Sequence, residues 1–119
     1  MVNKVILVGR LTADPEVRAT PSGMHVANLR LATNTYGGKD DEGNRREHTE
    51  FHSLVVFGKQ AQVAADYLRK GRLLYADGRL QHRSWDDADG RKHFSSEVVV
   101  DNFQMIGPKL EEAAVAVTA

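Results

Sequence analysis

The chain has 119 residues, which suits one domain with its own hydrophobic core and leaves no room for a second domain. It contains no cysteine, which excludes disulfide frameworks, thiolate zinc sites and cysteine nucleophiles. Sixteen Lys and Arg residues balance sixteen Asp and Glu residues, so the formal net charge is zero and a general affinity for polyanions is disfavoured.

The first half of the chain predicts three strands. Residues 3–11 indicate a buried first strand, with Gly9 at a bulge or a sharp bend. Residues 24–33 alternate between apolar and polar side chains, which is typical of a half-buried strand. No apolar side chain occurs in residues 37–47, so we expect a long, mobile hairpin loop there. A third strand is expected over residues 48–57.

The second half predicts one helix and two more strands. Residues 59–70 have apolar side chains at helical spacing, and Gly71 follows at the place of a C-terminal cap. Strand-forming residues dominate residues 72–85 and 92–100. The Asp-Gly pair in the segment between these two strands favours a turn, which makes a second long hairpin.

Three strands, a helix and two further strands follow the order of a five-stranded Greek-key oligonucleotide-binding barrel, a mainly β fold. We expect residues 1–107 to form this domain and residues 108–119 to be a disordered C-terminal extension. The apolar run at residues 5–8 is far shorter than a signal-peptide core or a membrane span. We therefore expect a cytoplasmic protein without membrane contact.

Aromatic side chains suggest what the barrel binds. The period of two along a strand places Phe51 and Phe57 on one face of the third strand. Tyr36 lies at the root of the first hairpin loop, and Trp85 lies near the tip of the second hairpin. Rings of this kind stack on any base at about 1–3 kcal/mol each, while Lys and Arg contact phosphates. The alternative is core packing, which is as good an explanation for the two Phe residues and a weaker one for Trp85.

Five motifs in order resemble the bacterial single-stranded DNA-binding proteins. They are residues 2–11, residues 14–18, Thr49-Glu50-Phe51-His52, Val56-Phe57-Gly58-Lys59 and Tyr67-Leu68-Arg69-Lys70-Gly71, and the resemblance spans about residues 2–106. It implies a homotetramer of oligonucleotide-binding barrels that wraps single-stranded DNA in replication, recombination and repair, associated with the nucleoid. It implies no enzymatic activity and no cofactor.

The resemblance also assigns roles to individual positions. The implied base-stacking residues are Tyr36, Phe51, Phe57 and Trp85. The implied basic contacts to DNA are Lys4, Arg46, Lys59, Lys70 and Arg83, each of which is otherwise a solvated surface charge. Over residues 59–83 six basic residues stand against two acidic ones, an excess that permits a basic patch without establishing it. His52 matches a subunit-contact histidine of the family.

Metal binding and partner recruitment are both disfavoured. His48 and His52 are the histidines with the closest spacing, but four residues of strand span about 13 Å, too far for one ion. The family carries an acidic, apolar-tipped tail that recruits replication and repair partners. No such tail follows Pro108, so we expect this chain not to bind partners that depend on the tail.

Two other functions remain open at this stage. One is an oligonucleotide-binding barrel that acts on RNA or as a primosome accessory protein, because no reader of the 2′-hydroxyl can be recognised in a sequence. The other is a hydrolase that uses Asp, Glu and His. It is the weakest candidate, because the chain has no Gly-x-Ser-x-Gly, no phosphate-binding Gly-Lys-Ser/Thr and no metal-ligand cluster.

Overall fold

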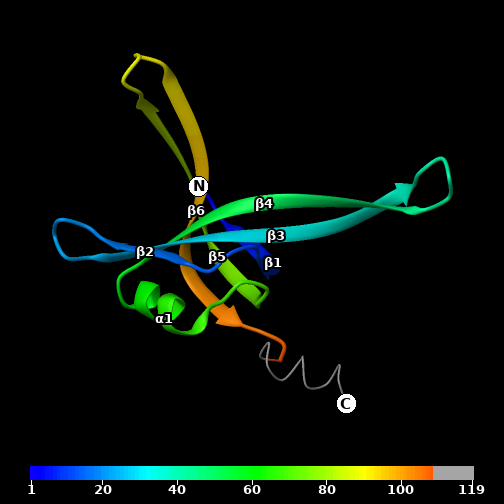
Figure 1. Cartoon of the computed structure of the whole chain (residues 1–119), viewed down its shortest axis with the longest axis horizontal. Helices are drawn as coiled ribbons and strands as arrows, with labels where there is room; N and C mark the ends of the chain where they lie inside the picture. Colours follow the sequence, from blue (N-terminus) through cyan, green and yellow to red (C-terminus); the bar gives the residue numbers. More distant parts are fainter. Residues whose placement is uncertain (109–119) are drawn as a thin grey trace.

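A computed structural model describes residues 1–108 of the chain. It contains six strands and one helix (Figure 1). In chain order these are β1 (Val5–Leu11), β2 (Glu16–Ala19), β3 (His25–Lys39), β4 (Arg45–Phe57), α1 (Lys59–Tyr67), β5 (Leu73–Asp86) and β6 (Lys92–Met105). The expected disorder of residues 108–119 concerns positions that, except for Pro108, lie outside the described part of the chain.

The strands form one sheet in the order β1-β5-β6-β4-β3-β2. The sheet closes on itself because the end of β1 also pairs with β3, at Arg10 with Ala32 and at Leu11 with Leu31. Strands β4 and β6 pair in parallel, which is the crossover of a Greek key, and the other pairs are antiparallel. The predicted five-stranded oligonucleotide-binding barrel is confirmed, with β2 added as a short outer strand on β3.

The barrel core comes from alternate residues of the strands, as the period of two requires. Its largest side chains with almost no exposure are Leu11, Leu31, Leu54, Val56 and Leu74, and Leu68 joins them from the segment after α1. Helix α1 contributes Ala61 and Ala64, two small side chains that bring the helix close to the barrel. Among residues 1–108 no helix is long and apolar enough to cross a membrane.

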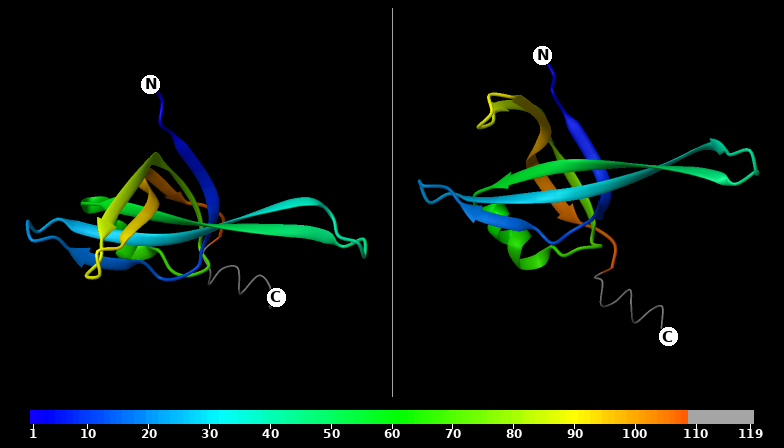
Figure 2. Two further views of the ribbon diagram at one scale, coloured as in Figure 1. Left: turned by 90° about the horizontal axis from the view of Figure 1, so that it is seen from above. Right: turned by 45° about the horizontal axis from the view of Figure 1, so that its top comes forward.

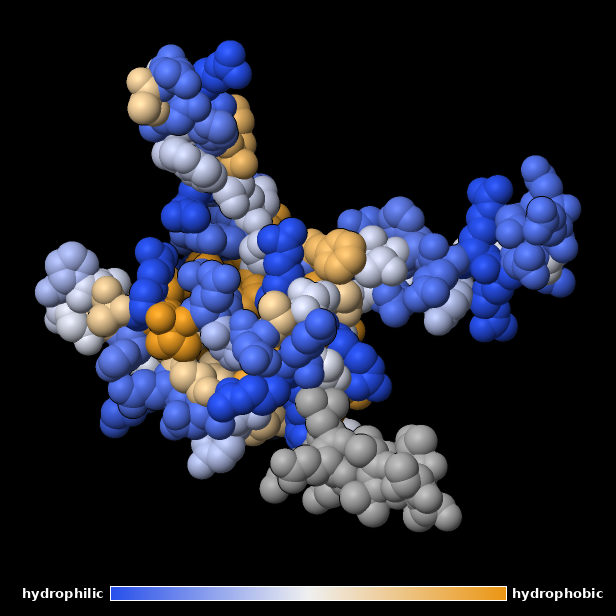
Figure 3. Space-filling view, viewed as in Figure 1, coloured by the Kyte–Doolittle hydropathy of each residue, from blue (hydrophilic) through white to orange (hydrophobic). Residues whose placement is uncertain are grey.

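Two long hairpins project from the barrel, one made by β3 and β4 and the other by β5 and β6 (Figure 2). Figure 3 shows them as mainly hydrophilic, whereas apolar surface gathers over the barrel. The expected loop over residues 37–47 is mostly strand, because β3 continues to Lys39 and β4 begins at Arg45. The prediction was wrong because backbone hydrogen bonds between β3 and β4 continue where no side chain is buried, so no apolar residue marks this part of the strands.

Three further expectations need correction. Helix α1 ends at Tyr67, since Leu68 is extended, and Gly71 belongs to the turn into β5, where its N–H donates to the carbonyl of Leu11. Strand β2 was not predicted, and all four of its residues are exposed, so no apolar alternation marks it. Strand β6 continues to Met105, beyond the predicted end at residue 100.

Gly9 and Gly58 illustrate two different reasons why the backbone needs a glycine. Gly9 pairs regularly with Leu74 and forms no bulge, but a Cβ there would lie 2.2 Å from the carbonyl oxygen of Ala32. The glycine therefore permits the close approach of β1 and β3 that closes the barrel. Gly58 has a φ of 70° between β4 and α1, which is a conformation that favours glycine.

Candidate nucleic-acid interface

The pairing of β3 with β4 places three of the predicted aromatic residues on the outer face of the barrel. The odd-numbered residues of β4 from Glu47 to Phe57 share a face, and Glu47 lies opposite Tyr36. Phe51 and Tyr36 are each 59% exposed, and Phe57 is 43% exposed. None of the three rings belongs to the core, so core packing does not explain them.

The hairpin of β5 and β6 brings the fourth ring to the same outer face. Val55 of β4 lies beside Val99 of β6, and alternate residues of β6 from there towards the hairpin tip keep this orientation. His93 is one of them, and it lies opposite Trp85. Trp85 is 47% exposed. Two hairpins that are distant in sequence therefore carry their rings on the outer side of the sheet.

A groove of about 380 Å³ lies in this outer face, between β2, β3 and β4 on one side and the β5–β6 hairpin on the other. Ser53 and Val55 line it, and they lie between Phe51 and Phe57 along β4. Its charged lining comprises three basic and three acidic side chains, which are Arg18, Arg30, Arg83, Asp14, Glu16 and Glu97. Of the five basic residues predicted to contact DNA, only Arg83 lines this groove.

The environment of Trp85 is more crowded than its exposure suggests. The His93 ring stacks on the indole, with ring centroids 5.6 Å apart and planes 19° apart. The guanidinium carbon of Arg83 lies 5.7 Å from the indole centroid, within the range of a cation–π contact. His93 in turn contacts Asp87, with Nε2 and Oδ2 2.8 Å apart. This contact, together with the backbone N–H groups of Arg91 and Asp89, lowers the pKa of Asp87 below its usual value.

The ribbon of β3 and β4 repeats the pairing of a ring with an arginine. The guanidinium carbon of Arg45 lies 5.3 Å from the centroid of Tyr36. Arg46, the basic residue that the resemblance implied here, follows Arg45 on the same strand and therefore points to the opposite face. Arg45 is the basic residue that accompanies Tyr36.

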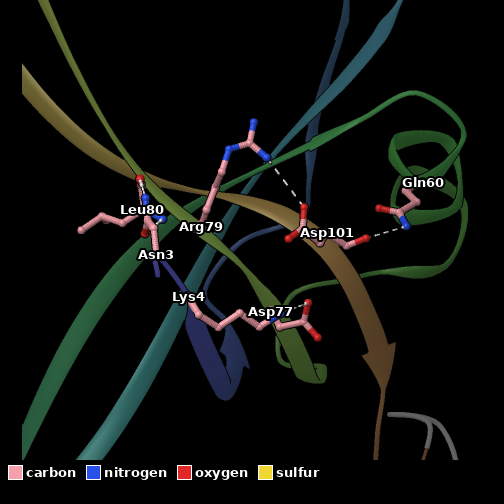
Figure 4. A network of polar contacts seen from close by, with 7 residues as sticks. All are labelled: Asn3, Lys4, Gln60, Asp77, Arg79, Leu80 and Asp101. Carbon is pink, nitrogen blue, oxygen red and sulfur yellow. Dashed lines mark hydrogen bonds and ion pairs between the residues drawn. The ribbon is translucent and has the colours of Figure 1, made fainter. Parts of the chain in front are cut away.

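Lys4 lies in a polar cluster that does not line the groove. Its Nζ is 3.2 Å from Oδ1 of Asp77, whose side chain is only 10% exposed (Figure 4). The hydroxyl of Tyr75 donates to the other oxygen of Asp77 over 2.8 Å. This hydrogen bond, and then the Lys4 ammonium, lower the pKa of Asp77, while the same hydrogen bond raises the pKa of Tyr75.

The remaining predicted residues lie outside the groove. Lys59 begins α1 and Lys70 follows the helix, and both are exposed. The backbone N–H of Lys70 donates to Oδ1 of Asp14, which does line the groove. His52 points to the inner side of β4 where the ribbon leaves the barrel, and its Nε2 is 2.9 Å from Oγ1 of Thr33. In residues 1–108 no group of three or more metal-ligating side chains could hold an ion.

Sequence reasoning missed four side chains that the fold brings to the outer face. Arg18 and Arg30 line the groove, Arg45 lies over Tyr36, and His93 stacks on Trp85. Alternation along β3 could have predicted that Arg30 points away from the core, because Leu29 and Leu31 on either side of it are buried. The others depend on which strands become neighbours, which no local pattern reveals.

Comparisons with known proteins agree with this architecture. Residues 2–106 match the single-strand binding protein family. Single-stranded DNA-binding protein 1 of Chlorobaculum tepidum is 50% identical over 109 residues, which make up 91% of this chain and 67% of that protein.

Two solved structures resemble the barrel. The complex of Plasmodium falciparum SSB with ssDNA has a TM-score of 0.81 and 26% identity, over 90% of this chain and 97% of that one. A deletion mutant of the single-stranded DNA-binding protein of Thermus aquaticus has a TM-score of 0.77 and 32% identity, over 91% of this chain and 52% of that one. Because the family match extends over almost the whole described part, the chain belongs to the single-strand binding protein family.

Proposed function

We propose that this protein binds single-stranded DNA without sequence preference, and that it protects such strands in replication, recombination and repair. The observation that carries the proposal is the placement of four exposed rings on the outer face of one barrel. They are Tyr36, Phe51, Phe57 and Trp85. Every base has a π-face, so stacking on such rings tolerates any sequence.

The proposal includes basic contacts to the phosphates. Arg83 and Arg30 lie in the groove between the rings, and Arg45 lies beside Tyr36. Lys4, Lys59, Lys70 and Arg46 belong to the proposed set as peripheral contacts on the path of a longer strand. Two relatives support the choice of ligand, since one is named a single-stranded DNA-binding protein and another was solved with ssDNA.

We further propose that the protein is a homotetramer. Ile6 and Val8 on β1 are 60% and 51% exposed, an unusual state for aliphatic side chains in the middle of a strand. His52 lies at the base of the β3–β4 ribbon and is proposed as a second subunit contact. A mass by light scattering near four times the 13.2 kDa of one chain is expected at micromolar concentration. A mass of a single chain would refute this part of the proposal.

The DNA-binding function is tested by titration with oligo-dT, the matching oligo-U and a DNA duplex. We expect oligo-dT to bind more tightly than the duplex, whose bases are already stacked on each other. Affinity should fall as salt rises from roughly 0.05 to 0.5 M, because Lys and Arg release counterions from the phosphates, and stacking should leave residual binding. Equal affinity for oligo-dT and the duplex, or no binding of oligo-dT and oligo-U, would contradict the function. Tighter binding of oligo-U than of oligo-dT would favour RNA as the ligand.

A further inference from the structure

Glu97 is an acidic residue that lines the groove in the proposed DNA surface. It lies on β6 opposite Gln81 of β5, and its side chain is 11% exposed. Nε of Arg83 is 3.1 Å from Oε1 of Glu97, and Nε2 of Gln81 donates to the same oxygen over 3.4 Å. The groove therefore holds a carboxylate that is fixed in place and paired with Arg83, which lies beside both the groove and Trp85.

A phosphate that reaches Arg83 has to compete with this carboxylate. The contact in the structure uses Nε, and the other guanidinium nitrogens of Arg83 have no ion-pair partner among residues 1–108. A carboxylate so little exposed is screened by salt less than a surface charge and repels a nearby phosphate more strongly. We propose that Glu97 is an internal competitor of DNA, which occupies Arg83 in the free protein and limits affinity. This inference rests on the proposed function.

The opposite role would be that Glu97 positions Arg83 for DNA, so that its loss would weaken binding. The structure favours competition, because Arg83 is also held against the Trp85 ring, at 5.7 Å, and does not depend on Glu97 alone for its position. The other two acids of the groove differ from Glu97. Asp14 accepts the backbone N–H of Lys70, and Glu16 is exposed on the outer strand β2.

The test is the substitution Glu97→Gln, which keeps the shape of the side chain and removes its charge. We expect oligo-dT to bind about two- to fivefold more tightly at low salt, the effect of releasing one partly exposed ion pair. The salt dependence should steepen by about 0.7 in the logarithmic slope, which corresponds to one more phosphate contact on a single strand. Glu50→Gln is the matched control, because Glu50 is an exposed carboxylate on the opposite face of β4.

A double variant identifies the partner. In an Arg83→Gln background, Glu97→Gln should bring no gain, because the competition requires Arg83. Equal or weaker binding by Glu97→Gln, a gain that persists without Arg83, or the same gain in Glu50→Gln would each overturn the inference. If Glu97→Gln lowers the melting temperature, Glu97→Thr repeats the test with a residue suited to a strand. Failure of the parent chain to bind oligo-dT would instead refute the proposed function.

Discussion

Along β4, neighbouring side chains meet two different environments. Leu54 and Val56 point inward and are 1% and 0% exposed, whereas Phe51 and Phe57 point outward and are 59% and 43% exposed. All four are apolar, so composition does not distinguish them, and only their position in the alternation does. One strand therefore supports stability on one face and, in our proposal, ligand binding on the other. Substitutions on the two faces should therefore have separable effects.

The largest expected effect is on the inner face. Leu54→Ala leaves a cavity among well-packed neighbours and should lower the free energy of unfolding by about 2–5 kcal/mol. Urea denaturation measures this loss. The fraction that remains folded should bind oligo-dT as the parent does. Weaker binding by the folded fraction would show that the two faces are coupled.

The next largest effect is expected at Phe51, which lies on the outer face of β4, three residues before Leu54. Phe51→Ala should weaken oligo-dT binding by about 1–3 kcal/mol, since it removes one stacking platform. The free energy of unfolding should change by only about 0.5 kcal/mol, as expected for an exposed position. Titration and urea denaturation of the same sample give both numbers. A large loss of stability with unchanged affinity would reverse the assignment of the two faces.

A smaller effect is expected from acid. The pKa values of Asp77 and Asp87 are lowered in the folded protein, so each carboxylate stabilises the fold above its ordinary pKa of about 3.9. This contribution is lost as the pH falls from about 4 through the lower pKa of the folded state. The free energy of unfolding of Asp77→Asn should decline less steeply in this range than that of the parent. Identical slopes would show that the Lys4–Asp77–Tyr75 cluster contributes nothing.

The smallest effect is expected from a ring on the other face of the β5–β6 hairpin. Phe94 is 76% exposed and lies opposite Ser84, on the face away from Trp85. If binding requires the outer face, Phe94→Ala should leave oligo-dT affinity unchanged, although it removes a ring that is more exposed than Phe51. A loss as large as that from Phe51→Ala would mean that exposure alone, and not the face, decides which rings bind.

The sequence predicted the parts of the fold that bury apolar side chains. The alternation in residues 24–33 and the helical spacing from residue 59 each reflect burial, and both elements are present. Strand β2 and the outer ribbon of β3 and β4 were missed, because exposed strands are held by backbone hydrogen bonds that any residue can make. Local patterns therefore show what a strand buries, and they do not show how far it continues.

Some residues of the candidate site could likewise be predicted from one strand alone, and others could not. Phe51 and Phe57 could be placed on one face by counting along a single strand, and Trp85 stood out among acidic neighbours. The stack of His93 on Trp85 and the pair of Arg83 with Glu97 require the register between β5 and β6. The resemblance implied Arg46, whereas Arg45 is the residue that lies beside Tyr36, and this difference depends on the register between β3 and β4.

The most direct test of the outer face as the binding surface uses Trp85, because it is the only tryptophan and its emission reports one position. We predict a large loss of tryptophan fluorescence on addition of oligo-dT and a much smaller loss with duplex DNA, since stacking on a free base quenches the indole. Trp85→Ala, titrated by light scattering, should bind about 1–3 kcal/mol more weakly and melt as the parent does. Unchanged emission while oligo-dT is bound, or a variant that unfolds readily yet binds normally, would contradict the account.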